Sequence, residues 1–245
     1  MKKVNKKKHN IFLIVGIIIV LSAVFLAVFC PVITKYDPIG VEVKDRITAP
    51  SVQHKLGTDE MGRDVLSRMF FGVRTSMIIG LSVAVLSTVA GIIIGVMAGY
   101  YKKVDNILMR ILDGIMAFPS IIIAIALAGI LGTGKVNIII ALSVAYFPTM
   151  ARIVRSSVLS LREIEYVQSV KVVGASDAYI IIHHIIPNIL SPIIVQMTFI
   201  FALSVFEMYK SGTQISSQPI FSSFPQYAAY DTGKMDSRHG NVRYR

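Results

Sequence analysis

Long runs of apolar side chains alternate with shorter polar stretches along most of this chain. The first run, residues 11–33, contains no charged residue, and as a helix it would reach roughly 34 Å, enough to cross a ~30 Å hydrocarbon core. Water opposes apolar runs of this length, whereas a bilayer favours them. Further spans are predicted near 77–101, 114–133, 136–151 and 189–206. The pattern predicts an all-α fold, a polytopic membrane helix bundle with about five spans.

The start of the chain admits two interpretations. Residues 1–10 carry five lysines and no acidic residue, and a basic start before an apolar run is also typical of a cleaved signal peptide. However, the run is longer than a signal core, and no pair of small residues marks a cleavage site. Phe29 precedes Cys30, where a lipoprotein signal would have a small residue. We therefore predict an uncleaved first span.

Basic residues beside the spans predict the orientation, because lysine and arginine stay on the cytoplasmic side. The N-terminal stretch 1–10 is placed in the cytoplasm of a multi-pass protein of the bacterial cytoplasmic membrane. Alternation then makes 34–76 an external segment, after the first span at 11–33. Residues 77–207 form the core of the bundle, and 208–245 form an atypical polar tail rich in Ser, Gln and Tyr.

Composition agrees with a membrane protein: 54% of the residues are hydrophobic and 16% are charged. The net charge of +11 could indicate nucleic-acid binding, but the basic residues lie between apolar blocks and form no stripe with exposed aromatics. The single cysteine, Cys30, excludes an internal disulfide. No nucleic-acid partner is predicted.

Gly91, Gly95 and Gly99 recur at a spacing of four residues within the second predicted span. On a helix these positions share one face and form a smooth groove. Such grooves allow two helix backbones to approach closely in lipid. We interpret this stripe as a packing surface.

Two sequence patterns suggest chemistry that their context excludes. Gly129–Lys135 has the spacing of a phosphate-binding loop, but Val136 supplies no hydroxyl group, and membrane spans flank the motif in place of a strand and a soluble domain. His183 and His184 are adjacent, so on a helix they point about 100° apart and cannot share one metal ion. Because no catalytic Ser/His/Asp set is visible either, we predict a non-enzyme with no cofactor, metal or catalytic residue.

The polar stretch 156–187 predicts a helical elbow between the fourth and fifth spans. A helix over 156–173 would end at Gly174, which suits the left-handed position after a helix. Ser176 can cap a second helix, and the acidic Asp177 suits its positive end. That helix is predicted to stop at Pro187, which has no backbone N–H.

This elbow resembles the EAA loop of ABC-importer permeases, within the peptide/nickel branch of that family. The resemblance rests on Glu165, Tyr166, Ser169, Val170, Gly174, Ala175 and Ser176, followed by His184, Pro187 and Asn188. Ser169 and Val170 stand where the family has two alanines. The resemblance implies that residues 165–176 dock into a cleft on an ATPase subunit.

The stretch His54–Ser76 is similar to a second signature, which precedes the second span of the C-type permease in the same branch. Its matching positions include Gly57, Thr58, Asp59, Gly62, Arg63, Asp64, Ser67 and Arg68. Within the bundle the same pattern is met by Asp113, Phe118, Pro119, Ala151, Arg152 and Arg155. The resemblance covers about residues 11–205.

The resemblance implies a permease subunit that moves peptides, nickel or a metal chelate across the membrane. Its implied partners are a second permease subunit, two cytoplasmic ABC ATPases, an external substrate-binding protein and the lipid bilayer. A passive channel, a membrane-embedded enzyme and a non-transporting scaffold remain as alternatives. The first two would need ionisable or catalytic residues within spans that carry almost no charge.

Beyond residue 205 the family pattern stops, and the sixth span of the family is absent. The abrupt change to Ser-, Tyr- and Arg-rich sequence suggests a reading-frame change late in the gene and, with it, an impaired permease. Resequencing the 3′ end tests this hypothesis, because an apolar continuation must then exist in another frame.

Overall fold

The computed structural model describes the backbone of residues 6–34, 36–132 and 134–215. Within them the structure is helical and has no strand, which confirms the all-α prediction. The long helices are α1 (Lys6–Ile33), α2 (Val65–Tyr100), α3 (Lys102–Met116), α4 (Ser120–Leu131), α5 (Lys135–Arg162) and α8 (Leu190–Ile215). Most of the tail 208–245 lies outside the described residues, and so do residues 1–5.

Four helical stretches in the described part are long and apolar enough to cross a membrane, and a bent pair of helices supplies a fifth. The four are Ile14–Ile33, Val65–Tyr100, Lys135–Arg162 and Asp177–Met208. This confirms the predicted number of about five spans.

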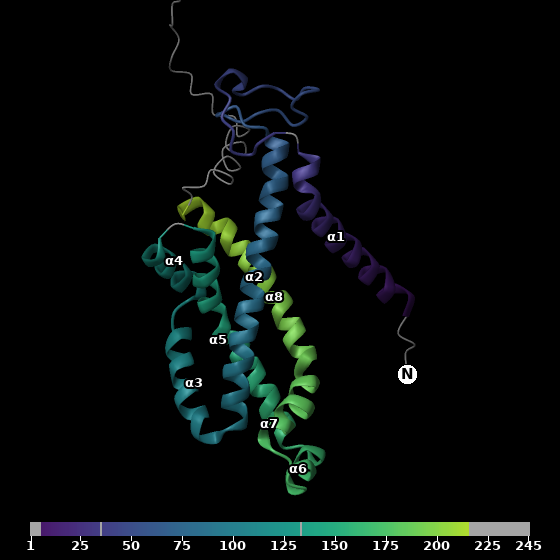
Figure 1. Cartoon of the computed structure of the whole chain (residues 1–245), viewed down its shortest axis with the longest axis vertical. Helices are drawn as coiled ribbons and strands as arrows, with labels where there is room; N and C mark the ends of the chain where they lie inside the picture. The colour runs from purple at the N-terminus through teal and green to yellow at the C-terminus, as the bar shows by residue number, and fades with distance from the viewer. Residues whose placement is uncertain (1–5, 35, 133, 216–245) are drawn as a thin grey trace, which may run out of the picture.

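Helices α2, α5 and α8 lie side by side along the long axis and form the bundle (Figure 1). The C-terminal end of α1 contacts α2, and the rest of α1 slants away from the bundle. Most apolar side chains of α1 therefore face outward. Helix α2 runs the whole length, from the 34–64 segment at one end to the elbow at the other (Figure 1). At about 1.5 Å per residue, its 36 residues reach roughly 54 Å.

The predicted glycine groove is the contact between α2 and α5. A Cβ atom at Gly95 would lie 2.6 Å from the carbonyl oxygen of Ala151, and one at Gly99 would lie 2.7 Å from the Cβ of Val158. Gly91 faces α5 in the same way. Only hydrogen side chains leave room for this approach, which buries the middle of both helices.

The single straight span predicted at 114–133 is wrong. Helix α3 ends at Met116, α4 begins at Ser120, and the two axes meet at 85°. Pro119 lies between them with extended backbone (ψ 136°) and supplies no N–H to continue the helix. It also disfavours helical geometry at the residue before it.

The predicted stop at Pro187 is also wrong, because the helix that starts at Asp177 continues into α8. Helix α7 (Asp177–Ile180) passes into a π-helical turn, η2 (Ile181–Ile185), and a 3₁₀ turn, η3 (Ile186–Ile189). Pro187 lies in the first turn of η3, where the missing N–H is tolerated. The π-helical and 3₁₀ turns accommodate Pro187, so the helix continues through it and the span does not end there.

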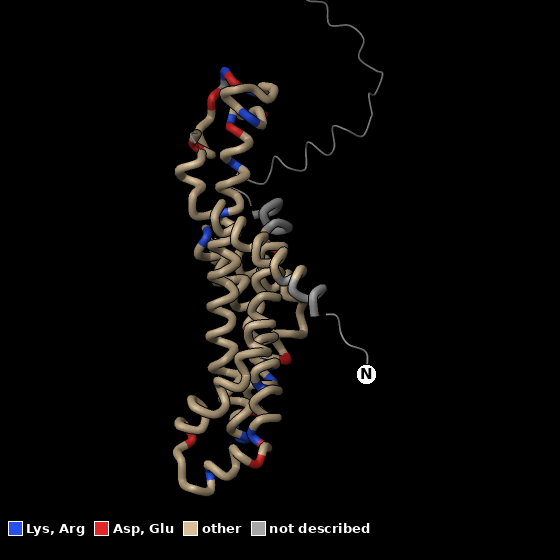
Figure 2. The backbone as a smooth tube through the Cα atoms, turned by 90° about the vertical axis from the view of Figure 1, so that its right-hand side faces the viewer, with Lys and Arg blue, Asp and Glu red and all other residues tan. Residues whose placement is uncertain are grey.

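Charged residues gather toward the two ends of the bundle, and the stretch between them is almost free of charge (Figure 2). This is the distribution that a bilayer imposes on a spanning protein. The two charged ends, the 34–64 segment and the elbow, are therefore the parts of the bundle that suit water.

Candidate functional site

The elbow consists of α6 (Glu165–Val172), a turn at Gly174, and α7. Gly174 has φ +92°, the left-handed geometry predicted for it, and a Cβ there would meet nothing within 4 Å. Ser176 caps α7 by accepting a hydrogen bond from the amide of Tyr179, as predicted. Asp177 is the first residue of α7.

The predicted continuous helix over 156–173 is wrong. Helix α5 ends at Arg162, and Ile164 has extended backbone (φ −75°, ψ 138°) before α6 begins. No Gly or Pro marks this break in the sequence. The change of direction lets Val167 of α6, 3% exposed, pack into the core of the bundle.

The residues predicted to face a partner divide between two faces of the elbow. Val170 and Ala175 pack against the bundle's own core, so the bulk of Val170 is directed inward. Exposed residues among those predicted are Glu165, Tyr166, Ser169, Gly174 and Ser176. Val172 and Val173 are 87% and 88% exposed, although the sequence analysis did not single them out.

Tyr166 ties α6 to the start of the last span. Its hydroxyl accepts a hydrogen bond from Asn188 Nδ2 at 3.0 Å and lies 3.4 Å from the carbonyl oxygen of His184. Asn188 Nδ2 also donates to that carbonyl at 2.6 Å. The structure thus brings Tyr166, at the start of the elbow signature, into contact with His184 and Asn188, which lie about twenty residues later in the sequence.

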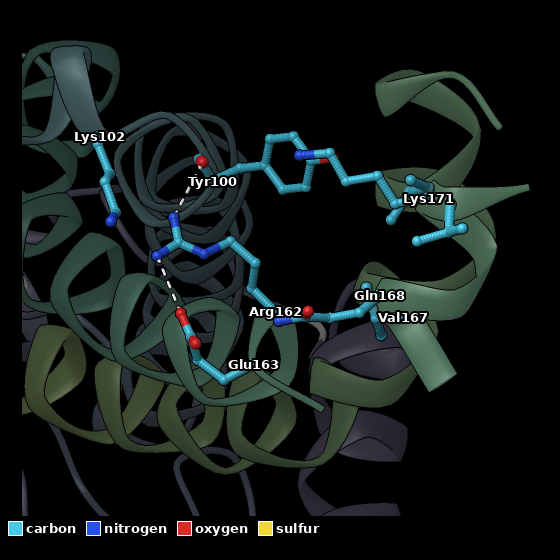
Figure 3. Close-up of a pocket in the computed structure, with 9 residues that line it drawn as sticks. Tyr100, Lys102, Arg162, Glu163, Val167, Gln168 and Lys171 are labelled. Carbon is cyan, nitrogen blue, oxygen red and sulfur yellow. Dashed lines mark hydrogen bonds and ion pairs between the residues drawn. The ribbon is translucent and has the colours of Figure 1, made fainter. Parts of the chain in front are cut away.

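Two further contacts hold the end of α2, one to the elbow and one to the end of α5, and the sequence analysis missed both. The Tyr100 hydroxyl donates to Asp177 Oδ1 at 2.7 Å. Arg162 Nη1 donates to the carbonyl oxygens of Gly99 and Tyr100, each at 3.1 Å, and Nη2 lies 3.2 Å from Glu163 Oε1 (Figure 3). Arg162 therefore satisfies carbonyls at the end of α2 that have no partner within the helix.

The second signature forms the turn that leads into α2. Asp59, 2% exposed, accepts hydrogen bonds from the amides of Met61 and Arg63, both at 2.9 Å, and from Arg63 Nε at 2.8 Å. Arg68 pairs with the same carboxylate. Burial disfavours the charged form of Asp59, but the hydrogen bonds from Arg63 and Met61 outweigh it and hold the pKa of Asp59 below its ordinary value.

The neighbouring signature residues hold this turn in place. Asp64 accepts from the Ser67 amide at 2.8 Å, which caps α2, and its other oxygen lies 3.1 Å from His54 Nδ1. Thr58 Oγ1 accepts from the Thr48 amide at 2.8 Å. All eight predicted positions of this signature lie together around the start of α2, where most are buried.

Gly57 and Gly62 have φ near +75°, which favours glycine, and each is covered by backbone. A Cβ at Gly57 would lie 2.5 Å from the Thr48 carbonyl oxygen, and one at Gly62 would overlap the carbonyl of Glu42. These two glycines explain the strict spacing of the signature.

Ion pairs join α3 to α5 at the positions that the bundle signature named. Arg155 binds Asp105 through two hydrogen bonds of 2.5 and 2.6 Å, and Arg152 lies 2.5 Å from Asp113. Asp105 was not among the predicted residues. Its pairing depends on the angle between two helices that are distant in sequence.

The described residues contain no cluster of three or more potential metal ligands. His183 stacks on the ring of Tyr179 with centroids 4.5 Å apart, and its Nδ1 lies 3.3 Å from the Tyr179 carbonyl oxygen. Within Gly129–Lys135, residues 129–131 belong to α4, and Lys135 is the first residue of α5.

The spans and the two polar ends define a multi-pass, helical integral membrane protein. A family model described as the binding-protein-dependent transport system inner membrane component matches residues 88–222, which extends beyond the end that the sequence resemblance predicted near residue 205. The chain belongs to this family of inner membrane transport permeases, which are non-catalytic subunits.

Similar proteins cover most of this chain. A putative peptide transport system permease protein of Brucella abortus is 45% identical over 198 residues, or 81% of this chain and 67% of its own length. A dipeptide transport system permease protein of Alkalihalophilus pseudofirmus is 40% identical over 206 residues (84% and 68%). An oligopeptide transport system permease protein of Bacillus subtilis is 36% identical over 200 residues (81% and 66%). The chain thus spans about two thirds of the length of these relatives.

Proposed function

We propose that this chain is a permease subunit of an ATP-binding-cassette importer that moves peptides across the cytoplasmic membrane. The observation that carries the proposal is the family match together with relatives that are named as peptide permeases. Nickel or a metal chelate is the second substrate class, and it rests on the sequence resemblance alone.

The proposed complex contains a second permease subunit, two cytoplasmic ATPases and an external substrate-binding protein. The N-terminus and the elbow lie in the cytoplasm, and the 34–64 segment lies outside. The five lysines among residues 1–10 support this orientation.

The elbow couples ATP hydrolysis to the spans. An ATPase surface binds the exposed side of α6, which carries Glu165, Ser169, Val172 and Val173. Movement of α6 is passed through Tyr166 and Asn188 to η3, which leads into α8, and movement of α7 is passed to α2 through Asp177 and Tyr100. Two spans thus respond to one contact, which biases the bundle between inward- and outward-facing states.

Association with the ATPases tests the coupling role. Ser169→Trp places a large side chain on the exposed side of α6, so we expect the purified permease to lose its ATPase subunits. Ser160→Trp is the matched control, because Ser160 is exposed on α5 outside α6 and α7. Equal recovery of the ATPases with both variants would show that the elbow does not bind them.

Uptake separates the substrate classes and the alternatives. A deletion strain complemented with this chain is expected to regain uptake of labelled di- and tripeptides, and not of ⁶³Ni. Restored nickel uptake alone would replace the peptide assignment. Failure to restore either one, with the ATPases still bound, would favour the non-transporting scaffold.

A further inference from the structure

A basic hollow lies where the end of α2 and the start of α3 meet the end of α5 and the elbow (Figure 3). Its volume is about 610 Å³. Its lining residues are Tyr100, Lys102, Arg162, Glu163, Val167, Gln168, Lys171, Val172 and Ile180. We propose that this hollow binds the phosphate headgroup of an anionic phospholipid.

The charges of the lining residues leave a positive excess. Lys102, Arg162 and Lys171 come from three different helices, and Glu163 is the one carboxylate in the lining. Glu163 is paired with Arg162, and its side chain is 68% exposed. Within the described part of the chain, no carboxylate lies within ion-pair distance of Lys102 or Lys171.

The backbone around the hollow also favours an anion. Lys102 is the first residue of α3, so its ammonium group sits at the positive end of that helix, where a cation is disfavoured and an anion is stabilised. The negative end of α2 is already covered by Arg162, which binds the carbonyls of Gly99 and Tyr100. Lys171 lies 5.9 Å from the centre of the Tyr100 ring and stays at the edge of the hollow.

The lining is amphipathic, which indicates a lipid in preference to a free phosphate ion. The buried Val167 and Ile180 lie behind the three cations as an apolar wall, and the exposed Val172 lies at its rim, next to the ATPase-binding side of α6. The hollow lies at the ends of α2 and α5, two helices that are long and apolar enough to span a membrane, and at the same end of the bundle as the elbow. Basic pockets between helices on the cytoplasmic side are known to suit acidic headgroups. The choice of leaflet rests on the proposed orientation, whereas binding itself does not.

Lipid retention tests the proposal. Full-length protein is purified in mild detergent with phosphatidylglycerol added, and bound lipid is counted by native mass spectrometry. The double variant Lys102→Gln/Lys171→Gln is expected to bind phosphatidylglycerol about 30-fold more weakly, because each lysine near an anionic headgroup contributes to affinity. Lys103→Gln is the matched control, since Lys103 is exposed next to the hollow and does not line it.

Comparison with a zwitterionic lipid, with inorganic phosphate and with the control variant distinguishes the possible explanations of lipid retention. Retention of phosphatidylglycerol but not of the zwitterionic phosphatidylethanolamine supports an acidic headgroup site. Displacement of the lipid by millimolar inorganic phosphate would show a simple phosphate site and overturn the assignment to lipid. Equal loss in Lys103→Gln and in the double variant would reduce the effect to general surface charge, and unchanged retention in the double variant would exclude the site. None of these results depends on ATPase binding or peptide uptake, so they leave the proposed function to its own tests.

Discussion

The 34–64 segment and the elbow, at opposite ends of the bundle, use charge in opposite ways. Beside the start of α2, Asp59 is buried with the guanidinium groups of Arg63 and Arg68, and its carboxylate forms ion pairs with both inside the protein. In the elbow, Glu165 is exposed, and Val172 and Val173 extend into solvent. The first region pairs its buried charges internally, and the second presents an exposed carboxylate beside two exposed valines.

Helix α2 connects these two regions directly. Asp64 caps its first turn, and the Tyr100 hydroxyl at its last residue binds Asp177 of the elbow. A fixed anchor at one end and a contact surface at the other suit a lever that passes movement along its length. Each prediction below alters one part of this arrangement.

Removing the charge of Asp59 should have the largest effect. Asp59→Asn leaves Arg63 buried without its counter-charge and removes an ion pair from Arg68, so we expect the free energy of unfolding to fall by about 3–5 kcal/mol. Thermal unfolding in detergent measures the loss. Glu60→Gln removes a charge from the exposed neighbour and should change stability little; similar losses in both variants would mean that the 34–64 segment is not a closed unit.

A methyl group in the glycine groove should separate α2 from α5. Gly95→Ala places a Cβ 2.6 Å from a backbone oxygen of α5, which we expect to cost about 1–3 kcal/mol and to weaken substrate-stimulated ATP hydrolysis. The control is Gly129→Ala, because a Cβ there meets nothing within 4 Å. If Gly95→Ala is as stable and as active as the control, the close approach of the two helices is wrong.

Cutting the link between α2 and the elbow should have a smaller effect. Tyr100→Phe removes the hydrogen bond to Asp177 at a cost of about 1 kcal/mol. We expect ATPase subunits to remain bound while their hydrolysis responds less to substrate. Tyr101→Phe alters the adjacent exposed tyrosine and should behave as the unaltered protein does; an unchanged response in Tyr100→Phe would assign coupling to other contacts.

Lowering the pH should have the smallest effect, a loss of the stability that the charge of Asp59 contributes. The pKa of Asp59 is lower in the folded protein than in the unfolded chain, so its stabilising effect is present above the unfolded pKa of about 3.9 and is lost as pH falls through the folded value. The stability difference between the protein and Asp59→Asn should therefore shrink below about pH 4. A difference that stays constant down to pH 2 would contradict the charge pairing.

Local patterns in the sequence predicted four of the spans, the glycine groove and the turn at Gly174, because each depends on residues close together in the chain. Pro119 and Pro187 show the limit of such reasoning. The first breaks a span and the second does not, since a π-helical turn accommodates Pro187 within a continuous helix. The contacts of Tyr100 and Arg162 could not be predicted, because they join helices whose angle is set by packing across the bundle.

Labelling of single cysteines from the two sides of the membrane tests the central claim, that α2 joins an external anchor to a cytoplasmic coupling surface. In a Cys30→Ser background, Val52→Cys and Ser169→Cys place one thiol at each exposed end. We predict that a membrane-impermeant maleimide labels Val52→Cys in intact cells, and labels Ser169→Cys only in opened membranes lacking the ATPase pair. Labelling of Ser169→Cys from outside, or labelling that the ATPases leave unchanged, would contradict the account.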